Sequence, residues 1–244
     1  MSRTAARTIS RPWLLLDRYF EQSERPLHSL IFVLPLIVLY QFSPTTNPAQ
    51  LIAFELLDRF FRFFGASGLI VPPLAVVGIL LVWHLARGDK WEVNLGTLLG
   101  MLLESALLTL PLFALAVAVS RFQVRIPLMA LRGNWLSLIT LSMGAGVYEE
   151  LVFRLMLLTT LHFLLVDLLR VPEKRAILLM VTSSAILFSF YHYLGYEQFA
   201  WKTCLFRTIA GIYFATLFLC RGFGITAGCH FTYDALVVLL TVHT

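Results

Sequence analysis

The chain alternates long apolar runs with short polar segments. A transmembrane helix needs about 20 predominantly apolar residues to cross a hydrocarbon core that is ~30 Å thick. Several runs approach or exceed that length, and a tight turn at residues 221–224 separates the last two. The pattern predicts about seven membrane-crossing helices, over residues 30–42 (extending back toward Pro26), 66–85, 93–119, 135–169, 176–194, 204–220 and 225–242.

Two further segments are amphipathic rather than uniformly apolar. In residues 51–64, Glu55, Asp58, Arg59 and Arg62 fall at i, i+3, i+4 and i+7, which places the four charges on one helix face. Residues 1–28 carry several arginines around a short apolar stretch. Both segments are therefore predicted to lie at the membrane surface.

The composition supports the membrane interpretation. The chain is 59% hydrophobic and 14% charged, with a mean hydropathy of +0.80, whereas soluble domains are roughly 45–50% apolar and 25% charged. The predicted fold is an all-α polytopic membrane helical bundle. Residues 1–134 are expected to supply N-terminal helices, a basic arm and interfacial helices, and residues 135–244 a helical core, within one integrated membrane domain.

The net charge of +5 is attributed to membrane topology and anionic lipid rather than to nucleic acid. More of the loop Lys and Arg residues fall on the side of the N-terminus than on the opposite side. The positive-inside rule then predicts a cytoplasmic N-terminus.

One apolar run contains charges that need an explanation. Glu149, Glu150 and Arg154 lie within residues 135–169, and an ionised side chain at the bilayer centre costs at least ~2.5–3.5 kcal/mol. Glu150 and Arg154 are four residues apart and can pair on one helix face. Glu149 points about 100° away from Glu150 in an α-helix. It is therefore the carboxylate available as a general base.

The same run is too long for a single straight crossing. About 35 residues extend for roughly 52 Å at 1.5 Å per residue, compared with a hydrocarbon core of ~30 Å. We expect this helix either to tilt well beyond the bilayer or to break near Gly144 and Gly146.

Two later runs add ionisable groups. His192 follows Phe188 by four residues, and His230 precedes Asp234 by four residues on the last helix. A bundle can bring such groups to one centre, and burying them separately would cost each its hydration. Carboxylates with two imidazoles suit hydrolysis, in which one group activates water and others stabilise the oxyanion. The same residue types also bind zinc, although His-Glu-x-x-His is absent.

These residues resemble the motifs of a known family. They occur in order on three predicted helices, as Glu149-Glu150-x-x-x-Arg154, Phe188-x-x-x-His192 and His230-x-x-x-Asp234. The order and spacing are similar to those of the CPBP family of intramembrane proteases, which comprises CAAX proteases and bacteriocin-processing proteins. The resemblance covers the chain from about Trp135 onward. It implies an all-helical intramembrane endopeptidase with its catalytic groups inside the bilayer.

The resemblance also implies roles for the residues. Glu149 would activate the attacking water together with His192. His230 and Asp234 would form the side of the site that stabilises the oxyanion. Glu150 would support the site from its pair with the arginine four residues later.

The chain departs from the family pattern at two positions. Leu155 stands where glycine is frequent, and Asp234 stands where asparagine is frequent. An ionised aspartate cannot donate a hydrogen bond. Family members are described both as metalloproteases and as metal-free glutamate-dependent proteases. The favoured glutamate mechanism requires no cofactor, and the alternative is one divalent metal (zinc) with the ligands Glu149, His192, His230 and Asp234.

The leading functional hypothesis is hydrolysis of a peptide bond near the membrane anchor of a lipidated or membrane-anchored protein or peptide. A prenylated CAAX tail, a peptide precursor and a sorting anchor all remain compatible, as does any oligomeric state. The expected location is a bacterial cell (inner) membrane, with the lipid bilayer as a partner and no nucleic acid.

Two alternatives remain from other functional classes. One is a proton- or ion-coupled transporter with a relay through Glu104, Glu149, Glu150 and His192. Such transporters usually show internal repeats, and the two halves of this sequence show none. The other is a non-catalytic immunity or scaffold protein of the same family, against which the intact set of glutamates and histidines argues.

Overall fold

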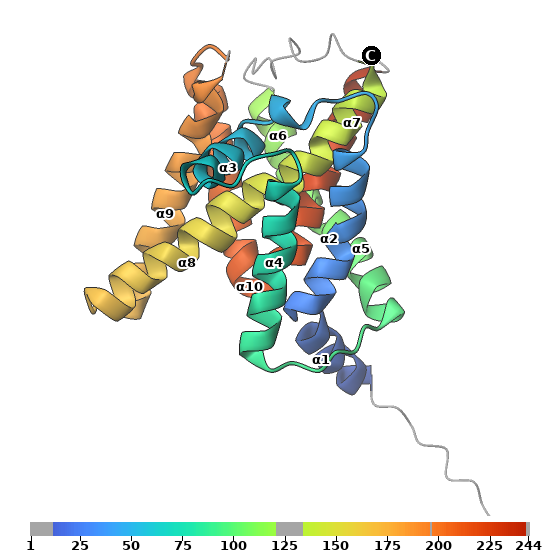
Figure 1. The fold of residues 1–244 in the computed structure, drawn as a ribbon. Helices are drawn as coiled ribbons and strands as arrows, with labels where there is room; N and C mark the ends of the chain where they lie inside the picture. The colour runs from blue at the N-terminus through green and yellow to red at the C-terminus, as the bar shows by residue number, and fades with distance from the viewer. Residues whose placement is uncertain (1–11, 121–133, 196, 243–244) are drawn as a thin grey trace, which may run out of the picture.

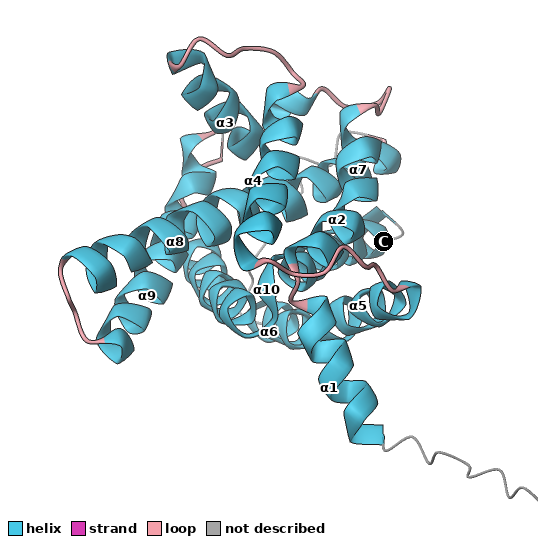
Figure 2. Ribbon diagram, turned by 60° about the horizontal axis from the view of Figure 1, so that its bottom comes forward, coloured by secondary structure: helices cyan, strands magenta, loops and turns pink. Residues whose placement is uncertain are grey.

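The computed structural model describes residues 12–120, 134–195 and 197–242. Within these ranges the chain is helical and contains no strand (Figure 1, Figure 2). This confirms the predicted all-α bundle. The α-helices are α1 (Pro12–Ser23), α2 (Pro26–Gln41), α3 (Ile52–Phe63), α4 (Val71–Arg87), α5 (Leu95–Leu108), α6 (Leu110–Ser120), α7 (Trp135–Gly144), α8 (Leu157–His162), α9 (Glu173–Tyr191) and α10 (Trp201–Val242).

The last element, α10, forms the centre of the bundle because it packs against α9, α5, α7 and α2. It is not one straight helix. Gly222 has φ 76° and ψ −176°, a conformation that glycine adopts at little cost. The Phe214 ring stacks on the His230 ring with centroids 4.6 Å apart. A straight helix would separate these two residues by roughly 24 Å, so α10 folds back at Gly222 into two antiparallel halves.

The number of membrane crossings differs from the expected seven. Four described helices are long and apolar enough to cross, or five if α1 and α2, which meet at a bend of 68°, are counted as one broken span. The four helices are Leu95–Val119, Trp135–Leu168, Glu173–Leu194 and Trp201–Leu240, and the last of these counts the two antiparallel halves of α10 as one. The count of seven is therefore not confirmed. Two expected crossings, α2 and α4, have 16 and 17 residues and are shorter than a full crossing requires.

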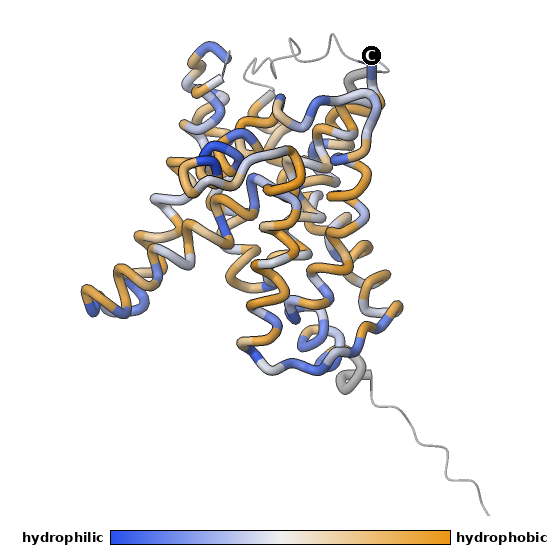
Figure 3. The backbone as a smooth tube through the Cα atoms, viewed as in Figure 1, coloured by the Kyte–Doolittle hydropathy of each residue, from blue (hydrophilic) through white to orange (hydrophobic). Residues whose placement is uncertain are grey.

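The outer surface of the bundle is apolar. Figure 3 shows hydrophobic residues along the length of the helices, with hydrophilic residues gathered on α3 and near the ends of the bundle. Leu99, Leu103 and Leu107 on the outer face of α5 are 58%, 62% and 55% exposed, which suits contact with lipid chains but not with water. Together with the spanning helices, this surface is that of an integral membrane protein.

The amphipathic segment forms the predicted helix. In α3, Glu55 pairs with Arg59 at 2.6 Å and Asp58 pairs with Arg62, both four residues apart. The opposite face is buried through Phe54 and its neighbours.

The long run after Trp135 forms one continuous helix, which crosses the bundle obliquely (Figure 1). It does not break at the two glycines. Its hydrogen bonding instead changes from α-helical to π-helical in η3 (Ala145–Glu149), η4 (Leu151–Met156) and η5 (Phe163–Leu168). At Gly146 it lies so close to α10 that an added Cβ would be 2.7 Å from the carbonyl oxygen of Ala227. The absence of a side chain there lets the two backbones meet.

Candidate active site

The paired glutamates lie where the long helix becomes π-helical. Glu149 is the last residue of η3, and Glu150 separates η3 from η4. Glu149 is 4% exposed, and both Glu150 and Arg154 are 0% exposed. π-Helical turns inside α-helices are frequent at functional sites. Here the wider turn coincides with the place where the helix meets α9 and α10.

Glu150 links the long helix to α10. One carboxylate oxygen, Oε2, is 3.1 Å from Nε of Arg154, so the pair expected from the sequence is present. The other oxygen, Oε1, accepts a hydrogen bond of 2.7 Å from Nδ1 of His230. This bond holds the imidazole so that Nε2 points away from Glu150. Nε2 then lies 3.8 Å from Oε2 of Glu149 and 3.5 Å from Oδ2 of Asp234.

His192 approaches the same carboxylate from α9. Its Nδ1 is 2.8 Å from the carbonyl oxygen of Phe188, and because a carbonyl only accepts, Nδ1 is the donor. Nε2 of His192 is left 3.8 Å from Oε2 of Glu149. Two imidazole nitrogens from two helices thus face one carboxylate oxygen at equal distances. Both distances exceed that of a direct hydrogen bond.

Aromatic rings enclose the ionisable groups. Phe214 stacks on His230, and Phe188 contacts the rings of both His192 and His230. The guanidinium carbon of Arg154 lies 4.5 Å from the centroid of the Phe188 ring and 5.7 Å from that of Phe214, within the range of a cation–π contact. The rings exclude water from the charged pair behind the site.

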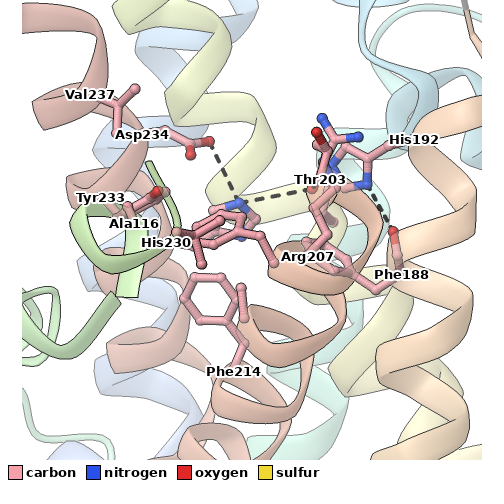
Figure 4. Close-up of a pocket in the computed structure, with 14 residues that line it drawn as sticks. Ala116, Phe188, His192, Thr203, Arg207, Phe214, His230, Tyr233, Asp234 and Val237 are labelled. Carbon is pink, nitrogen blue, oxygen red and sulfur yellow. Dashed lines mark hydrogen bonds and ion pairs between the residues drawn. The ribbon is translucent and has the colours of Figure 1, made fainter. Parts of the chain in front are cut away.

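A cavity of about 290 Å³ adjoins this cluster (Figure 4). Glu149, His192, His230 and Asp234 line it, whereas Glu150 and Arg154 do not. The structure therefore brings all six predicted site residues together in two layers: four residues face the cavity, and a fully buried ion pair lies behind them.

Several residues of the site were not predicted from the sequence. The Tyr191 hydroxyl donates to Oε1 of Glu149 at 3.3 Å, and Thr203, Arg207 and Phe214 line the cavity. Arg207 offered a signal, because it is a cation in an apolar run and carries the same insertion cost as the paired glutamates. The aromatic residues offered none, since the chain contains 20 Phe and 8 Tyr.

The donor set includes the residue types that bind zinc. Zinc bonds of about 2.0–2.2 Å to nitrogen and oxygen place two donors of a tetrahedral site roughly 3.3–3.6 Å from each other. The Nε2 atoms of His192 and His230 each lie 3.8 Å from Oε2 of Glu149, and Nδ1 of His230 is engaged by Glu150. Among the residues that the structure describes, no group of three or more His, Cys, Asp or Glu side chains is arranged to hold a metal ion.

Glu104 belongs to a different cluster. Arg221 donates to both of its carboxylate oxygens, at 2.6 and 2.9 Å, and Tyr19 donates to one of them. The transporter hypothesis needs Glu104 to exchange protons with Glu149 and His192. The structure instead pairs Glu104 with a cation at the turn of α10, so no observation favours the relay.

Comparison with known proteins agrees with the motif analysis. Residues 131–236 match the family model described as type II CAAX prenyl endopeptidase Rce1-like. The matched region contains the π-helical segment, the end of α9 and both halves of α10. No curated protein and no solved structure matches the chain.

Proposed function

We propose that this integral membrane protein hydrolyses a peptide bond with Glu149 as the general base, and the match of residues 131–236 to the Rce1-like type II CAAX prenyl endopeptidase model supports the proposal. The observation that carries the proposal is the position of Oε2 of Glu149. This oxygen is buried, accepts no hydrogen bond within the described residues, and faces Nε2 of both His192 and His230. A water that donates to it lies within reach of both imidazoles.

The reaction then follows from general acid–base chemistry. Glu149 takes a proton from the water while the water oxygen bonds to the scissile carbonyl carbon, whose π electrons move to oxygen. The tetrahedral intermediate collapses as the carbon–nitrogen bond breaks. Glu149 returns its proton to the leaving amine, so atoms and charge balance. Tyr191 and His192 hold the carboxylate and the water in position, and such positioned proton transfer contributes about 10²–10⁴-fold to rates.

The opposite side of the cavity stabilises the developing oxyanion. Nδ1 of His230 is already fixed on Glu150, so in its doubly protonated form this histidine donates from Nε2 into the cavity. Asp234 lies beside that nitrogen at 3.5 Å and donates only when protonated. The pair of Glu150 and Arg154 positions His230 without touching substrate.

The proposed substrate is a lipidated or membrane-anchored protein or peptide that is cut near its anchor. The cavity lies between helices that are apolar enough to cross the membrane, so the scissile bond has to enter from the bilayer. Purified protein in liposomes should cleave a peptide that carries a lipid anchor. The same peptide without the anchor should be cleaved far more slowly. Undiminished cleavage by both Glu149→Ala and His192→Ala would contradict the proposal.

We further propose that the reaction needs no metal, because Nδ1 of His230 is engaged by Glu150 and the described residues contain no group of three His, Cys, Asp or Glu side chains arranged around one point. Elemental analysis of the purified protein, combined with activity before and after chelator treatment, tests this. Activity that persists in metal-depleted protein is the expected result. Activity that disappears and returns with zinc would instead assign metal binding to Glu149, His192, His230 and Asp234.

The orientation in the membrane is part of the same proposal. We place the N-terminus in the cytoplasm of a bacterial cell, with α1 at that end of the bundle. The cavity is lined by Val119 at the end of α6, Thr203 near the start of α10 and Val237 near its end, and the last turns of α10 lie at the end of the bundle opposite α1 (Figure 1). Labelling of single cysteines placed near residues 88 and 198 with a membrane-impermeant reagent tests which end faces outward.

A further inference from the structure

A second, larger cavity lies away from the candidate active site, between α4, the long helix and α10. Its volume is about 820 Å³, compared with about 290 Å³ beside Glu149. Val82 and Leu219 in its walls are 66% and 45% exposed, so it is a groove that opens to the surroundings of the bundle. We call it the α4 groove, and its walls include Glu24, Gly78, Val82, Arg87, Leu155 and Leu219.

The α4 groove is about as long as one leaflet of the bilayer. Its residues on α4 recur at helical spacing from Ala75 to Arg87, a separation of roughly 18 Å at 1.5 Å per residue. Half of a hydrocarbon core that is ~30 Å thick is about 15 Å. In Figure 1, α4 runs from the level of α3 to the end of the bundle at which α1 lies. The groove therefore spans one leaflet and reaches its headgroup region.

The groove is apolar along most of its length and becomes polar at one end. Ala75 and Ile79 line the part nearer α3. Gly78 widens the groove, because an added Cβ there would have no heavy atom within 4 Å. Trp83 and Arg87 follow one turn apart toward the other end, and both residue types are frequent where a helix meets the headgroups. This order matches a lipid whose acyl chain lies along α4 and whose headgroup lies beside Arg87.

The polar end of the groove carries one cation and one carboxylate. Arg87 is 40% exposed and uses Nε for Asp89, at 2.9 Å, so its two terminal nitrogens remain for a ligand. Glu24 is 44% exposed, and Oε1 accepts from Arg221 at 3.0 Å, so Oε2 remains. A headgroup with both a phosphate and an ammonium complements this pair. An anionic headgroup without an amine would place its charge near Glu24 with nothing to donate to it.

We propose that the α4 groove binds one phospholipid of the leaflet nearer α1, with a primary amine in its headgroup. Its phosphate accepts from Arg87, and its ammonium donates to Glu24. Lipid chains surround the whole bundle, so the apolar walls select no lipid by themselves and the charged pair provides the selectivity. Leu155, which directly follows Arg154 in η4, lines the groove, so the bound chain packs against the π-helical segment. The inference does not depend on the proposed hydrolysis.

The test titrates purified protein in detergent with three phospholipids that share dioleoyl chains and differ in headgroup, and native mass spectrometry counts the lipids bound. Phosphatidylethanolamine should bind one per chain and more tightly than phosphatidylcholine, whose quaternary ammonium has no N–H to donate. It should also bind more tightly than phosphatidylglycerol, which has no amine. Arg87→Gln should weaken binding of phosphatidylethanolamine by roughly fivefold, the effect of one cation near a membrane surface. Glu24→Gln should narrow the preference over phosphatidylglycerol.

Two matched comparisons separate this groove from the rest of the lipid-facing surface. Lys90→Gln removes an exposed cation at the same end of α4 that does not line the groove, and should retain full binding. Gly78→Leu fills the groove and should weaken binding by roughly 5- to 100-fold, the range expected for overpacking, whereas Gly78→Ala adds one methyl group and should keep most of it. Thermal melts without lipid establish that each variant is folded.

Melts with lipid add a second measurement. A ligand that binds the folded state stabilises it, so phosphatidylethanolamine should raise the melting midpoint of wild type and leave that of Gly78→Leu almost unchanged. Equal binding of all three lipids, with no dependence on Arg87 or Gly78, would mean contact with bulk lipid only and would overturn the inference. Tighter binding of phosphatidylglycerol would also overturn it, because Glu24 would then select no amine. Neither measurement contains a peptide substrate, so the outcome is separate from that of the proposed hydrolysis.

Discussion

Two clusters of charge in this bundle, one fully buried and one partly exposed, differ in how completely their hydrogen bonds are satisfied. At the turn of α10, each nitrogen of the Arg221 guanidinium that can donate has a partner: Nε and Nη2 donate to Glu104, Nη1 donates to Glu24, and Nη2 also donates to Ser23. Both oxygens of Glu104 are engaged. This cluster joins α1, α5 and α10, and both Arg221 and Glu104 are fully engaged within it.

The cluster on the π-helical segment is different. Arg154 lies 3.1 Å from Glu150 as an ion pair, but none of its three guanidinium nitrogens makes a well-directed hydrogen bond within the described residues. Oε2 of Glu149 accepts none either. Buried polar groups are normally satisfied, so these exceptions need a functional reason. A charge inside a membrane helix therefore does not by itself mark a reactive site, and the carboxylate proposed as the general base differs from Glu104 in having an unpaired oxygen beside a cavity.

The largest expected effect separates the two clusters by activity. Glu149→Gln keeps the shape of the side chain but removes the general base, and should lower kcat/KM by about 10²–10⁴-fold. Glu104→Gln should leave the rate per folded molecule unchanged, since the hydrogen bonds of Glu104 within the described residues come from Arg221 and Tyr19. Initial rates on an anchored peptide, normalised to folded protein, measure both. A comparable loss in Glu104→Gln would show that the two clusters are coupled.

The next effect concerns stability. Arg154→Met leaves the fully buried Glu150 without its cation, which should cost about 3–5 kcal/mol. Arg221→Met should cost less, about 1–3 kcal/mol, because the side chains of Glu104 and Glu24 are 21% and 44% exposed and retain some solvation. Chemical unfolding in mixed micelles compares the two variants.

A double variant provides the control for this ranking. Glu150→Gln combined with Arg154→Met removes the unpaired charge and should recover part of the lost stability. If Arg221→Met proved to be the more destabilising single variant, the order of the two effects would be reversed. The cluster of Arg221, Glu104 and Glu24 would then contribute more to stability than the pair of Glu150 and Arg154.

A smaller effect tests the close contact between the long helix at Gly146 and α10, which sets the spacing of the site residues. In Gly146→Ala the new Cβ would lie 2.7 Å from the carbonyl oxygen of Ala227 and 2.9 Å from Cβ of Phe231. Relief of such overpacking typically costs about 1–3 kcal/mol. It should also lower activity by separating Glu149 from His230. Gly78 has open space around it, so Gly78→Ala should be neutral or stabilise α4 by up to about 1 kcal/mol.

Thermal melts and initial rates on both glycine variants test this contact. Equal behaviour of the two variants would mean that the long helix can move away from α10 without harm. The separation of Glu149 from His230 could then increase without a loss of activity, contrary to the prediction.

The six site residues were predictable because each stands out chemically from its run. Two acids within an apolar helix, and pairs of ionisable groups four residues apart, mark one face of a helix whatever its neighbours are. The turn at Gly222 was also predictable, since Arg221 and two glycines interrupt an apolar run. Local chemistry determined these features, so the sequence alone was enough to locate them.

The features that the sequence did not predict depend on how the helices pack against one another. Helix length suggested either a tilt or a break near the two glycines, and the structure has one continuous oblique helix with π-helical turns at Ala145 and Leu151 (Figure 1). Tyr191 reaches Glu149 only because α9 packs alongside η4. The count of seven crossings is not confirmed, since α2 and α4 have 16 and 17 residues, fewer than the ~20 of a typical crossing. Each of these outcomes is set by tertiary packing rather than by a local pattern.

The smallest expected effect is that of Asp234→Asn, at a position where the matched family often has asparagine. Asp234→Asn replaces a group that donates only when protonated with one that always donates, and Oδ2 lies 3.5 Å from Nε2 of His230. If this position stabilises the oxyanion, the asparagine variant should stay within about threefold of wild type, whereas Asp234→Ala should lose roughly 10²-fold in kcat, as expected for a lost oxyanion donor. Steady-state rates on one anchored peptide compare the pair. An inactive Asp234→Asn would mean that the carboxylate itself is required, and the position would then belong with Glu150 among the groups that orient His230.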